Sequence, residues 1–117
     1  MTQVAVLFSV LVAVSLPVVA APSGQNGKVV FDKWCAPCHG AIAPRGGALP
    51  GTAALSVKYK GKVPAVLTER TDLAPAFIKT VVRHGLFGMP ITRKTEISDA
   101  ELEDVVEYLT RNRKPRP

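Results

Sequence analysis

The sequence feature that most constrains this chain is the motif Cys35-x-x-Cys38-His39, which holds both cysteines of a 117-residue sequence. Two thiols three residues apart can each bond to one of the two vinyl groups of a single porphyrin, and the adjacent imidazole can bind the iron from the proximal side. Such a pattern is typical of a c-type haem attachment site. It predicts one covalent haem c as cofactor, with Cys35 and Cys38 as tethers and His39 as an iron ligand.

Three other interpretations of the motif stay open in the sequence. A thioredoxin-like redox pair needs alternating strands and helices around it, and strand patterns are negligible here. Zinc bound by the motif residues Cys35, Cys38 and His39 together with His84 fits none of the usual ligand spacings. The third interpretation is a chance match. We favour haem attachment over all three.

Few side chains of this sequence can fill the sixth position of a haem iron: Met89, His84, or none. Met89 lies in Gly88-Met89-Pro90, where the proline stiffens a loop that can reach over the ring. His84 precedes Gly85 at a predicted helix end, where a histidine on the solvent side favours the negative helix terminus. We therefore expect Met89 as the second metal ligand, whereas an open site would indicate peroxidase or gas-binding chemistry.

The first 27 residues carry no charged side chain. An apolar run over residues 4–14 is followed by Pro17 and by small residues ending at Ala20, which is typical of an export signal cut after that alanine. The alternative is an uncleaved membrane anchor, but the run is short for a span and Ser15 interrupts its continuation. We expect residues 1–20 to be a signal peptide, with a periplasmic protein and no stable membrane insertion after cleavage.

The remaining length allows one small domain. We expect a flexible leader at residues 21–26, the domain at residues 27–112 and a basic tail at residues 113–117. Residues 40–72 are rich in glycine and proline and predict a long loop. Such a loop is uncommon in a compact domain unless something else organises it, and a haem would supply the missing core.

Apolar periodicity predicts three helices in this domain. The first runs from about Gly27 into the cysteine motif, and the second begins at Pro75 and stops at Gly85. The third covers residues 99–110 and is preceded by the capping box Ser98-x-x-Glu101. The expected fold class is all-α.

A wider pattern links these helices to the motif. It comprises Gly27 and Phe31, Cys35-x-x-Cys38-His39, Gly88-Met89-Pro90, and the Leu102–Leu109 helix with Tyr108. The pattern resembles the class I c-type monohaem cytochromes, and the resemblance implies a small fold wrapped around one covalent haem, with the first and last helices crossing. It also implies that a proline carbonyl accepts a hydrogen bond from the proximal imidazole. Pro44 is our candidate, and Pro50 competes with it.

A second group of segments extends beyond the haem-binding motifs. It comprises Pro50-Gly51-Thr52-x-x-Leu55, Lys58-Tyr59-Lys60-Gly61-Lys62, Glu69-Arg70-Thr71-Asp72-Leu73 and Met89-Pro90-x-x-Arg93-Lys94-Thr95-Glu96-Ile97. These segments are similar to cytochrome subunits of flavocytochromes that oxidise 4-alkylphenols, such as 4-cresol dehydrogenase and eugenol hydroxylase. The resemblance implies an electron-transfer subunit and not an enzyme.

The same resemblance implies two partners. One is an FAD-containing dehydrogenase subunit of the vanillyl-alcohol oxidase family, and the other is a soluble acceptor such as a cupredoxin or another cytochrome. Related small cytochromes share several of these segments. A free soluble cytochrome that serves another dehydrogenase or a terminal oxidase is therefore the alternative function.

Two aromatic side chains, Trp34 and Tyr59, could hydrogen-bond a haem propionate through their polar atoms. An aromatic residue at either position is as simply explained by partial burial in the domain. We keep both as candidate cofactor-binding residues.

Charge is divided along the chain. Eleven basic and three acidic residues lie between Lys28 and Lys94, whereas Glu96 to Glu107 holds six acidic residues and no basic one. Export and the lack of interleaved aromatic and basic residues argue against nucleic acid as a partner. We expect a docking face around Phe87 and Ile91 with a basic rim. The expected rim residues are Lys58, Lys60, Lys62, Arg83, Arg93 and Lys94.

Overall fold

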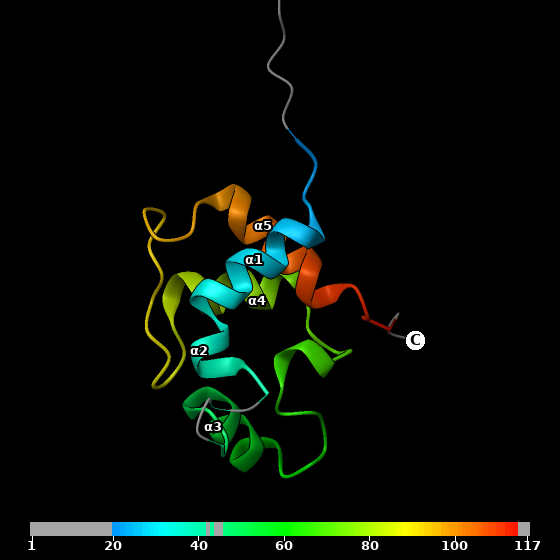
Figure 1. Cartoon of the computed structure of the whole chain (residues 1–117), viewed down its shortest axis with the longest axis vertical. Helices are drawn as coiled ribbons and strands as arrows, with labels where there is room; N and C mark the ends of the chain where they lie inside the picture. The colour runs from blue at the N-terminus through cyan, green and yellow to red at the C-terminus, as the bar shows by residue number, and fades with distance from the viewer. Residues whose placement is uncertain (1–19, 42, 44–45, 115–117) are drawn as a thin grey trace, which may run out of the picture.

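The computed structural model describes residues 20–41, 43 and 46–114. Their elements are α1 Gly24–Trp34, α2 Ala36–His39, α3 Pro50–Tyr59, the 3-10 helix η1 Leu67–Glu69, α4 Pro75–His84 and α5 Asp99–Thr110 (Figure 1). Within these described ranges the only β pairing is an isolated bridge between Leu86 and Met89, so the predicted all-α fold class is confirmed. Residues 1–19 of the predicted signal peptide, Pro44, and the last three residues of the predicted tail lie outside the described residues.

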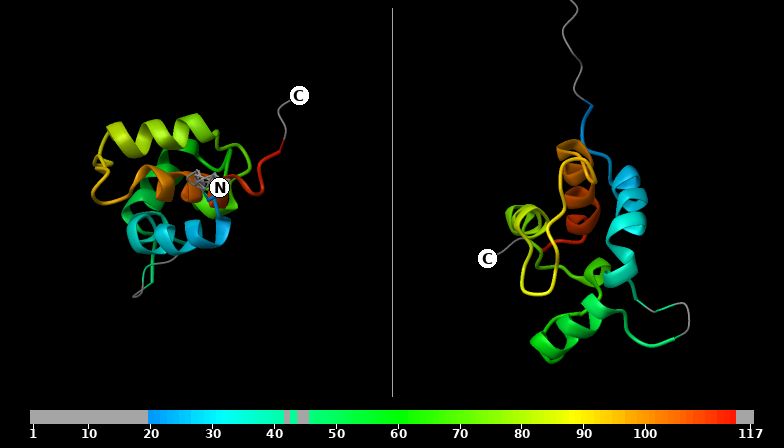
Figure 2. Two further views of the ribbon diagram at one scale, coloured as in Figure 1. Left: turned by 90° about the horizontal axis from the view of Figure 1, so that it is seen from above. Right: turned by 90° about the vertical axis from the view of Figure 1, so that its left-hand side faces the viewer.

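Helices α1 and α5 pack side by side, and a glycine permits their close approach (Figure 2). A Cβ added at Gly27 would lie 1.9 Å from the backbone oxygen of Asp104, so only glycine fits there. One turn later the rings of Phe31 and Tyr108 meet with their centroids 5.5 Å apart. This is the crossing of first and last helices that the resemblance implied.

Helix α1 begins at Gly24, three residues earlier than expected, so the predicted flexible leader at residues 21–26 is too long. Ser23 caps the helix, because its side chain accepts a hydrogen bond from the backbone N–H of Asn26. Asp104 on α5 accepts hydrogen bonds from the Ser23 backbone N–H at 2.5 Å and from the Asn26 side chain. Contacts with α5 hold the start of α1 in place. The local sequence pattern does not reveal them, because α5 is distant along the chain.

The expectation of one long loop over residues 40–72 is wrong, because α3 occupies its middle. Pro50 stands in the first turn of α3, where its missing N–H costs nothing, and Lys60 ends the helix in a left-handed conformation with φ of +49°. The Thr52 hydroxyl donates to the backbone oxygen of Gly40 at 2.7 Å and ties α3 to the end of α2.

The predicted bounds of the last two helices are confirmed. Helix α4 runs from Pro75 to His84 with Gly85 as its cap, and α5 begins with the predicted reciprocal hydrogen bonds between Ser98 and Glu101. Together with α1 they enclose the core. Its buried apolar residues are Val30, Phe31, Leu73, Ile78, Val82, Ile97, Leu102, Val105, Val106 and Leu109. No helix in the described part of the chain is long and apolar enough to cross a membrane.

Candidate functional site

A cavity of about 580 Å³ lies among α2, α3, α4, α5 and the segments that join them. Cavities of this size hold cofactors and other small ligands, and the lining here is mainly apolar, as a large flat hydrophobic group requires. Four residues with candidate cofactor chemistry line it. They are Cys35, Cys38, His39 and Met89.

The cysteine motif is built as a tight turn between two helices. Helix α1 ends at Trp34, and the single turn of α2 is closed by the backbone N–H of His39, which donates to the backbone oxygen of Cys35 at 2.8 Å. This turn places both free thiols and the imidazole on the same cavity. Burial, followed by the neighbouring Cys38, raises the pKa of the Cys35 thiol to about 11, so this sulfur keeps its proton at neutral pH.

The His39 side chain is half-buried and lies beside the start of α3. Its Nδ1 atom has no hydrogen-bond partner among the described residues, and burial lowers the pKa of the imidazole, which favours the neutral form that binds metals. A Cβ added at Gly51 would lie 2.6 Å from His39 Cε1 and 2.7 Å from Nδ1. The backbone of α3 therefore presses against the ring at a position where only glycine fits.

Proline support for His39 stays a prediction. Pro44 lies outside the described residues, and Pro50 lines the cavity without accepting a hydrogen bond from His39.

Met89 lies in the loop between α4 and α5, in a closed turn. The Met89 N–H donates to the Leu86 backbone oxygen at 3.0 Å, and the Leu86 N–H donates back to the Met89 oxygen at 3.2 Å. This turn needs glycine at position 85, because Gly85 has φ of +72° and an added Cβ would lie 2.6 Å from the Met89 backbone oxygen. The turn directs Met89 to the cavity lining, where it packs against the core.

The structure separates the other candidates. Tyr59 lines the cavity, whereas Trp34 does not and its side chain is 41% exposed. His84 also lies outside the lining, and its Nδ1 is 3.1 Å from the backbone oxygen of Thr80. Among the described residues no group of three or more histidine, cysteine and acidic side chains is arranged so that it could hold a metal ion.

Arg70 is a site residue that sequence reasoning missed. It is only 4% exposed, lines the cavity, and places its guanidinium carbon 4.6 Å from the centre of the Tyr59 ring. Asp72 pairs with it, accepting from Arg70 Nε at 2.8 Å and from Nη2 at 2.5 Å. This pair raises the pKa of Arg70 and lowers that of Asp72, so a fixed positive charge stands beside a mainly apolar lining. In the sequence, the sign of this pair is an acidic residue two positions after a basic one, in Arg70-Thr71-Asp72.

These residues fit a haem. Two thiols, a thioether and an imidazole whose Nδ1 has no hydrogen-bond partner among the described residues line one apolar cavity. The comparisons agree. Residues 22–109 match the family described as cytochrome C oxidase, cbb3-type, subunit III.

The chain is also 30% identical over 109 residues to the 4-cresol dehydrogenase [hydroxylating] cytochrome c subunit of Pseudomonas putida, covering 93% of this chain and 79% of that subunit. No solved structure gives a significant match. The resemblance inferred from the sequence is therefore confirmed. The chain belongs to the cytochrome c family described as cytochrome C oxidase, cbb3-type, subunit III, and is an electron-transfer cytochrome that binds haem c.

Proposed function

We propose that this protein is the cytochrome subunit of a dehydrogenase that oxidises 4-alkylphenols, and that it carries electrons away through one covalently bound haem c. The observation that carries the proposal is the meeting of Cys35, Cys38, His39 and Met89 on one apolar cavity. The similarity to a 4-cresol dehydrogenase cytochrome subunit supports the choice of donor. The protein would bind no substrate of its own.

Each site residue has one role in this proposal. The bound haem supplies a reversible one-electron site. Cys35 and Cys38 tether it through thioether bonds, each made by adding an S–H group across a vinyl double bond. His39 would hold the iron through its imidazole and Met89 through its soft thioether sulfur, which would favour the reduced state and raise the potential.

The rest of the lining controls water and charge. Apolar side chains from α4 and α5, among them Ile78, Val82 and Leu109, exclude water from the cofactor. Low polarity around the site reduces the solvent reorganisation that accompanies a change of charge. Arg70 and Tyr59 place polar atoms on the same cavity, where they can receive the propionates; Trp34 is less well placed for this role.

The proposed partners are inferred from the similarity to a 4-cresol dehydrogenase cytochrome subunit and from the number of electrons transferred. A dehydrogenase that oxidises a phenol gives up two electrons, while a single haem accepts one at a time, so an FAD-containing subunit of the vanillyl-alcohol oxidase family suits the donor role. A soluble acceptor, such as a cupredoxin or another cytochrome, would then remove each electron. The second candidate is a free soluble cytochrome that serves another dehydrogenase or a terminal oxidase; the family description names an oxidase subunit and so favours the oxidase of these two.

The proposed compartment is the periplasm, reached through a signal peptide cut after Ala20. Helix α1 begins at Gly24, just beyond that cut, where Ser23 caps it and Asp104 accepts a hydrogen bond from the Ser23 backbone N–H. Cleavage would therefore leave the domain intact. The mass of the purified protein tests this proposal, because an uncut chain would retain residues 1–20.

Covalent attachment is tested on a denaturing gel stained for haem. The wild-type band should stain, and the Cys35→Ala, Cys38→Ala double variant should give neither stain nor a stable product. Accumulation of that variant as a folded, haem-free protein would contradict the proposal. Rapid binding of carbon monoxide by the reduced wild-type protein would instead indicate an open sixth site and an enzyme.

The donor is tested by purifying the native protein and identifying what accompanies it. The expected companion is a flavoprotein that reduces this cytochrome when a 4-alkylphenol is added. Reduction of a terminal oxidase by the free cytochrome, with no accompanying flavoprotein, would favour the second candidate.

A further inference from the structure

We propose that Arg83 is a positioning residue that holds the loop carrying Met89, so that removing it releases the thioether from the iron. The inference rests on the assignment of Met89 as the sixth ligand under the proposed function. Arg83 was expected on the basic rim of a docking face, but its side chain is only 17% exposed and turns toward the loop.

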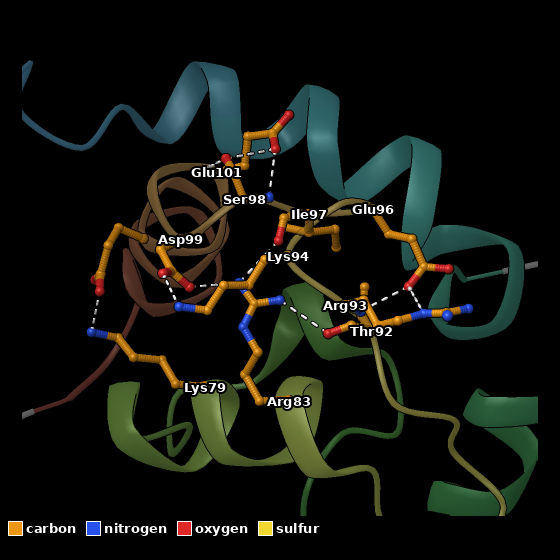
Figure 3. A network of polar contacts seen from close by, with 11 residues as sticks. Lys79, Arg83, Thr92, Arg93, Lys94, Glu96, Ile97, Ser98, Asp99 and Glu101 are labelled. Atoms are coloured by element: carbon orange, nitrogen blue, oxygen red, sulfur yellow. Dashed lines mark hydrogen bonds and ion pairs between the residues drawn. The ribbon is translucent and has the colours of Figure 1, made fainter.

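Arg83 lies in the last turn of α4 and makes three hydrogen bonds (Figure 3). Its Nη1 donates to the backbone oxygen of Thr92 at 3.0 Å. Its Nη2 donates to the backbone oxygen of Ile97 at 2.9 Å and to Asp99 Oδ1 at 2.9 Å. One guanidinium therefore joins α4 to two points of the loop and to the start of α5.

Thr92 is the contact nearest to Met89, three residues further along the chain. Its backbone N–H donates to the Val82 oxygen at 2.8 Å, while its oxygen accepts from Arg83. Both backbone polar groups of Thr92 are thus held by α4. On the other side of Met89, the paired hydrogen bonds with Leu86 close the turn. Met89 therefore lies between two held points of the loop, which are the turn with Leu86 and the backbone of Thr92. Arg83 makes one of the two hydrogen bonds that hold Thr92.

The other charged contacts of the loop cannot replace Arg83. Lys94 reaches Asp99 at 2.6 Å and Arg93 reaches Glu96 at 3.8 Å, but these pairs involve largely exposed side chains, which contribute little. Arg83 binds backbone oxygens from a mostly buried position, and charge-assisted hydrogen bonds of this kind are stronger. Removing it leaves two carbonyls without this donor and frees the loop to move.

The experiment compares the wild-type holoprotein with Arg83→Ala and a matched control, Lys79→Ala. Lys79 lies one turn earlier on α4 and pairs with Glu103 of α5 at 2.5 Å, so it also joins the two helices, but it has no ion pair with the loop among the described residues. Three quantities are measured: the weak thioether-to-iron absorption at the red end of the visible spectrum, the rate at which the reduced protein binds carbon monoxide, and the midpoint potential.

Arg83→Ala is expected to weaken the red absorption, bind carbon monoxide about tenfold faster and have a lower potential, because the state with Met89 released becomes about tenfold more populated. Lys79→Ala should match the wild type in all three, even if its unfolding midpoint falls. A purely structural role for Arg83 would lower the unfolding midpoint and leave the three quantities unchanged, and that result would overturn the inference.

A second variant covers the case in which Arg83→Ala yields no holoprotein. Arg83→Lys keeps the charge but has one ammonium in place of the planar fork that bonds Thr92 and Ile97 together. It should bind carbon monoxide about threefold faster than the wild type, and an unchanged rate would overturn the inference.

The failures of the two proposals remain distinguishable. If the wild type lacks the red absorption, the ligand assignment fails and the role of Arg83 falls with it. If the wild type has the absorption and both Arg83 variants keep it, only the role of Arg83 fails.

Discussion

At the scale of single residues, Gly51 is the position whose change tests the site most directly. In Gly51→Ala the new Cβ would meet the His39 ring at 2.6 Å and the Cys38 backbone oxygen at 2.8 Å. We expect the ring to shift and the unfolding free energy of the holoprotein to fall by about 2 kcal/mol through overpacking. Better helix propensity alone would favour alanine by about 1 kcal/mol, so a loss isolates the contact.

Haem content, the visible spectrum and the unfolding midpoint measure this effect. Ser56→Ala, an exposed change on the same helix, is the control and should leave all three unaltered. A Gly51→Ala protein with wild-type spectrum and stability would mean that α3 does not position His39.

The sequence predicted which residues carry the chemistry, but not which residues hold them in place. Thiols, imidazole and thioether have few uses at these spacings, so Cys35, Cys38, His39 and Met89 could be proposed from residue type alone. Their roles stay predictions that the shared cavity supports. Gly51 and Arg83 could not be found in this way, because each acts through a neighbour that only the folded chain brings near.

At the scale of helices, the crossing of α1 and α5 predicts a large difference between two glycines of one helix. Gly27→Ala places a Cβ 1.9 Å from the Asp104 oxygen, whereas Gly24→Ala places one 3.8 Å from the Glu107 side chain. We expect Gly27→Ala to destabilise the protein by about 3 kcal/mol, because two backbones must separate. Gly24→Ala should be neutral or slightly stabilising.

Thermal or denaturant unfolding of the holoproteins measures both changes. Equal effects of the two substitutions would show that the helices can separate at little cost, and the crossing would then not determine the fold.

The amino terminus of α5 predicts a loss of stability in acid. Hydrogen bonds from the Ser98 backbone and hydroxyl lower the pKa of Glu101, and those from Lys94 and Arg83 lower the pKa of Asp99. Carboxylates with lowered pKa values stabilise the fold above their ordinary values, which are 4.5 for glutamate and 3.8 for aspartate, and the stabilisation is lost as the pH falls through the lowered values.

The unfolding midpoint of the wild type should therefore decrease as the pH is lowered from about 5 to about 3, and that of Glu101→Gln should decrease less steeply. The variant keeps a hydrogen-bonding side chain but cannot titrate. Identical slopes would mean that the capping box contributes nothing to the acid sensitivity.

Helix prediction succeeded where a helix buries an apolar stripe in the protein core and failed where almost none of its residues is buried. Helices α4 and α5 line the cavity but also present apolar residues to the protein core at helical spacing, and their bounds were predictable. Helix α3 has only Thr52 buried and directs Ala54, Leu55 and Tyr59 to the cavity. The apolar partner of α3 would be a cofactor, so α3 lacks the helical spacing of apolar residues that indicates packing against a protein core.

At the scale of the whole molecule, the cavity explains how a small chain with few buried apolar residues forms a single fold. Ten apolar residues form the protein part of the core, and the cavity of about 580 Å³ lies against several of them, including Leu73, Val105 and Leu109. A void of that size would cost much of the stability of a small domain. A bound haem turns the same surface into buried contact area, which couples folding to cofactor attachment.

The surface around the cavity is where we expect a partner to dock. The structure leaves fewer free cations there than the basic rim that the sequence predicted. Arg83 is turned inward, while Arg93 and Lys94 are paired with carboxylates. The remaining cations are Lys58, Lys60 and Lys62, for which no ion pair is found among the described residues. Phe87, whose ring centre lies 5.4 Å from Lys58 Nζ, is 92% exposed yet also lines the cavity, so it marks the edge through which a partner could approach the cofactor.

This arrangement predicts that Phe87→Ala and Lys60→Glu weaken the complex with the donor dehydrogenase in different ways. Phe87 would be desolvated at the contact, so its truncation should raise the dissociation constant about tenfold at low and high salt alike. Lys60 acts over distance, so its reversal should slow association at low salt, and screening within about 10 Å should remove the effect at high salt.

The control is Val29→Ala, because Val29 is 64% exposed on α1 and does not line the cavity. Binding measured across ionic strength separates the two contributions, since a general loss of stability would not make the effect of one substitution depend on salt and leave that of the other unchanged. If Val29→Ala weakened the complex and Phe87→Ala did not, the donor would approach the face formed by α1, and electrons would have to enter through protein instead of at the exposed edge of the cavity.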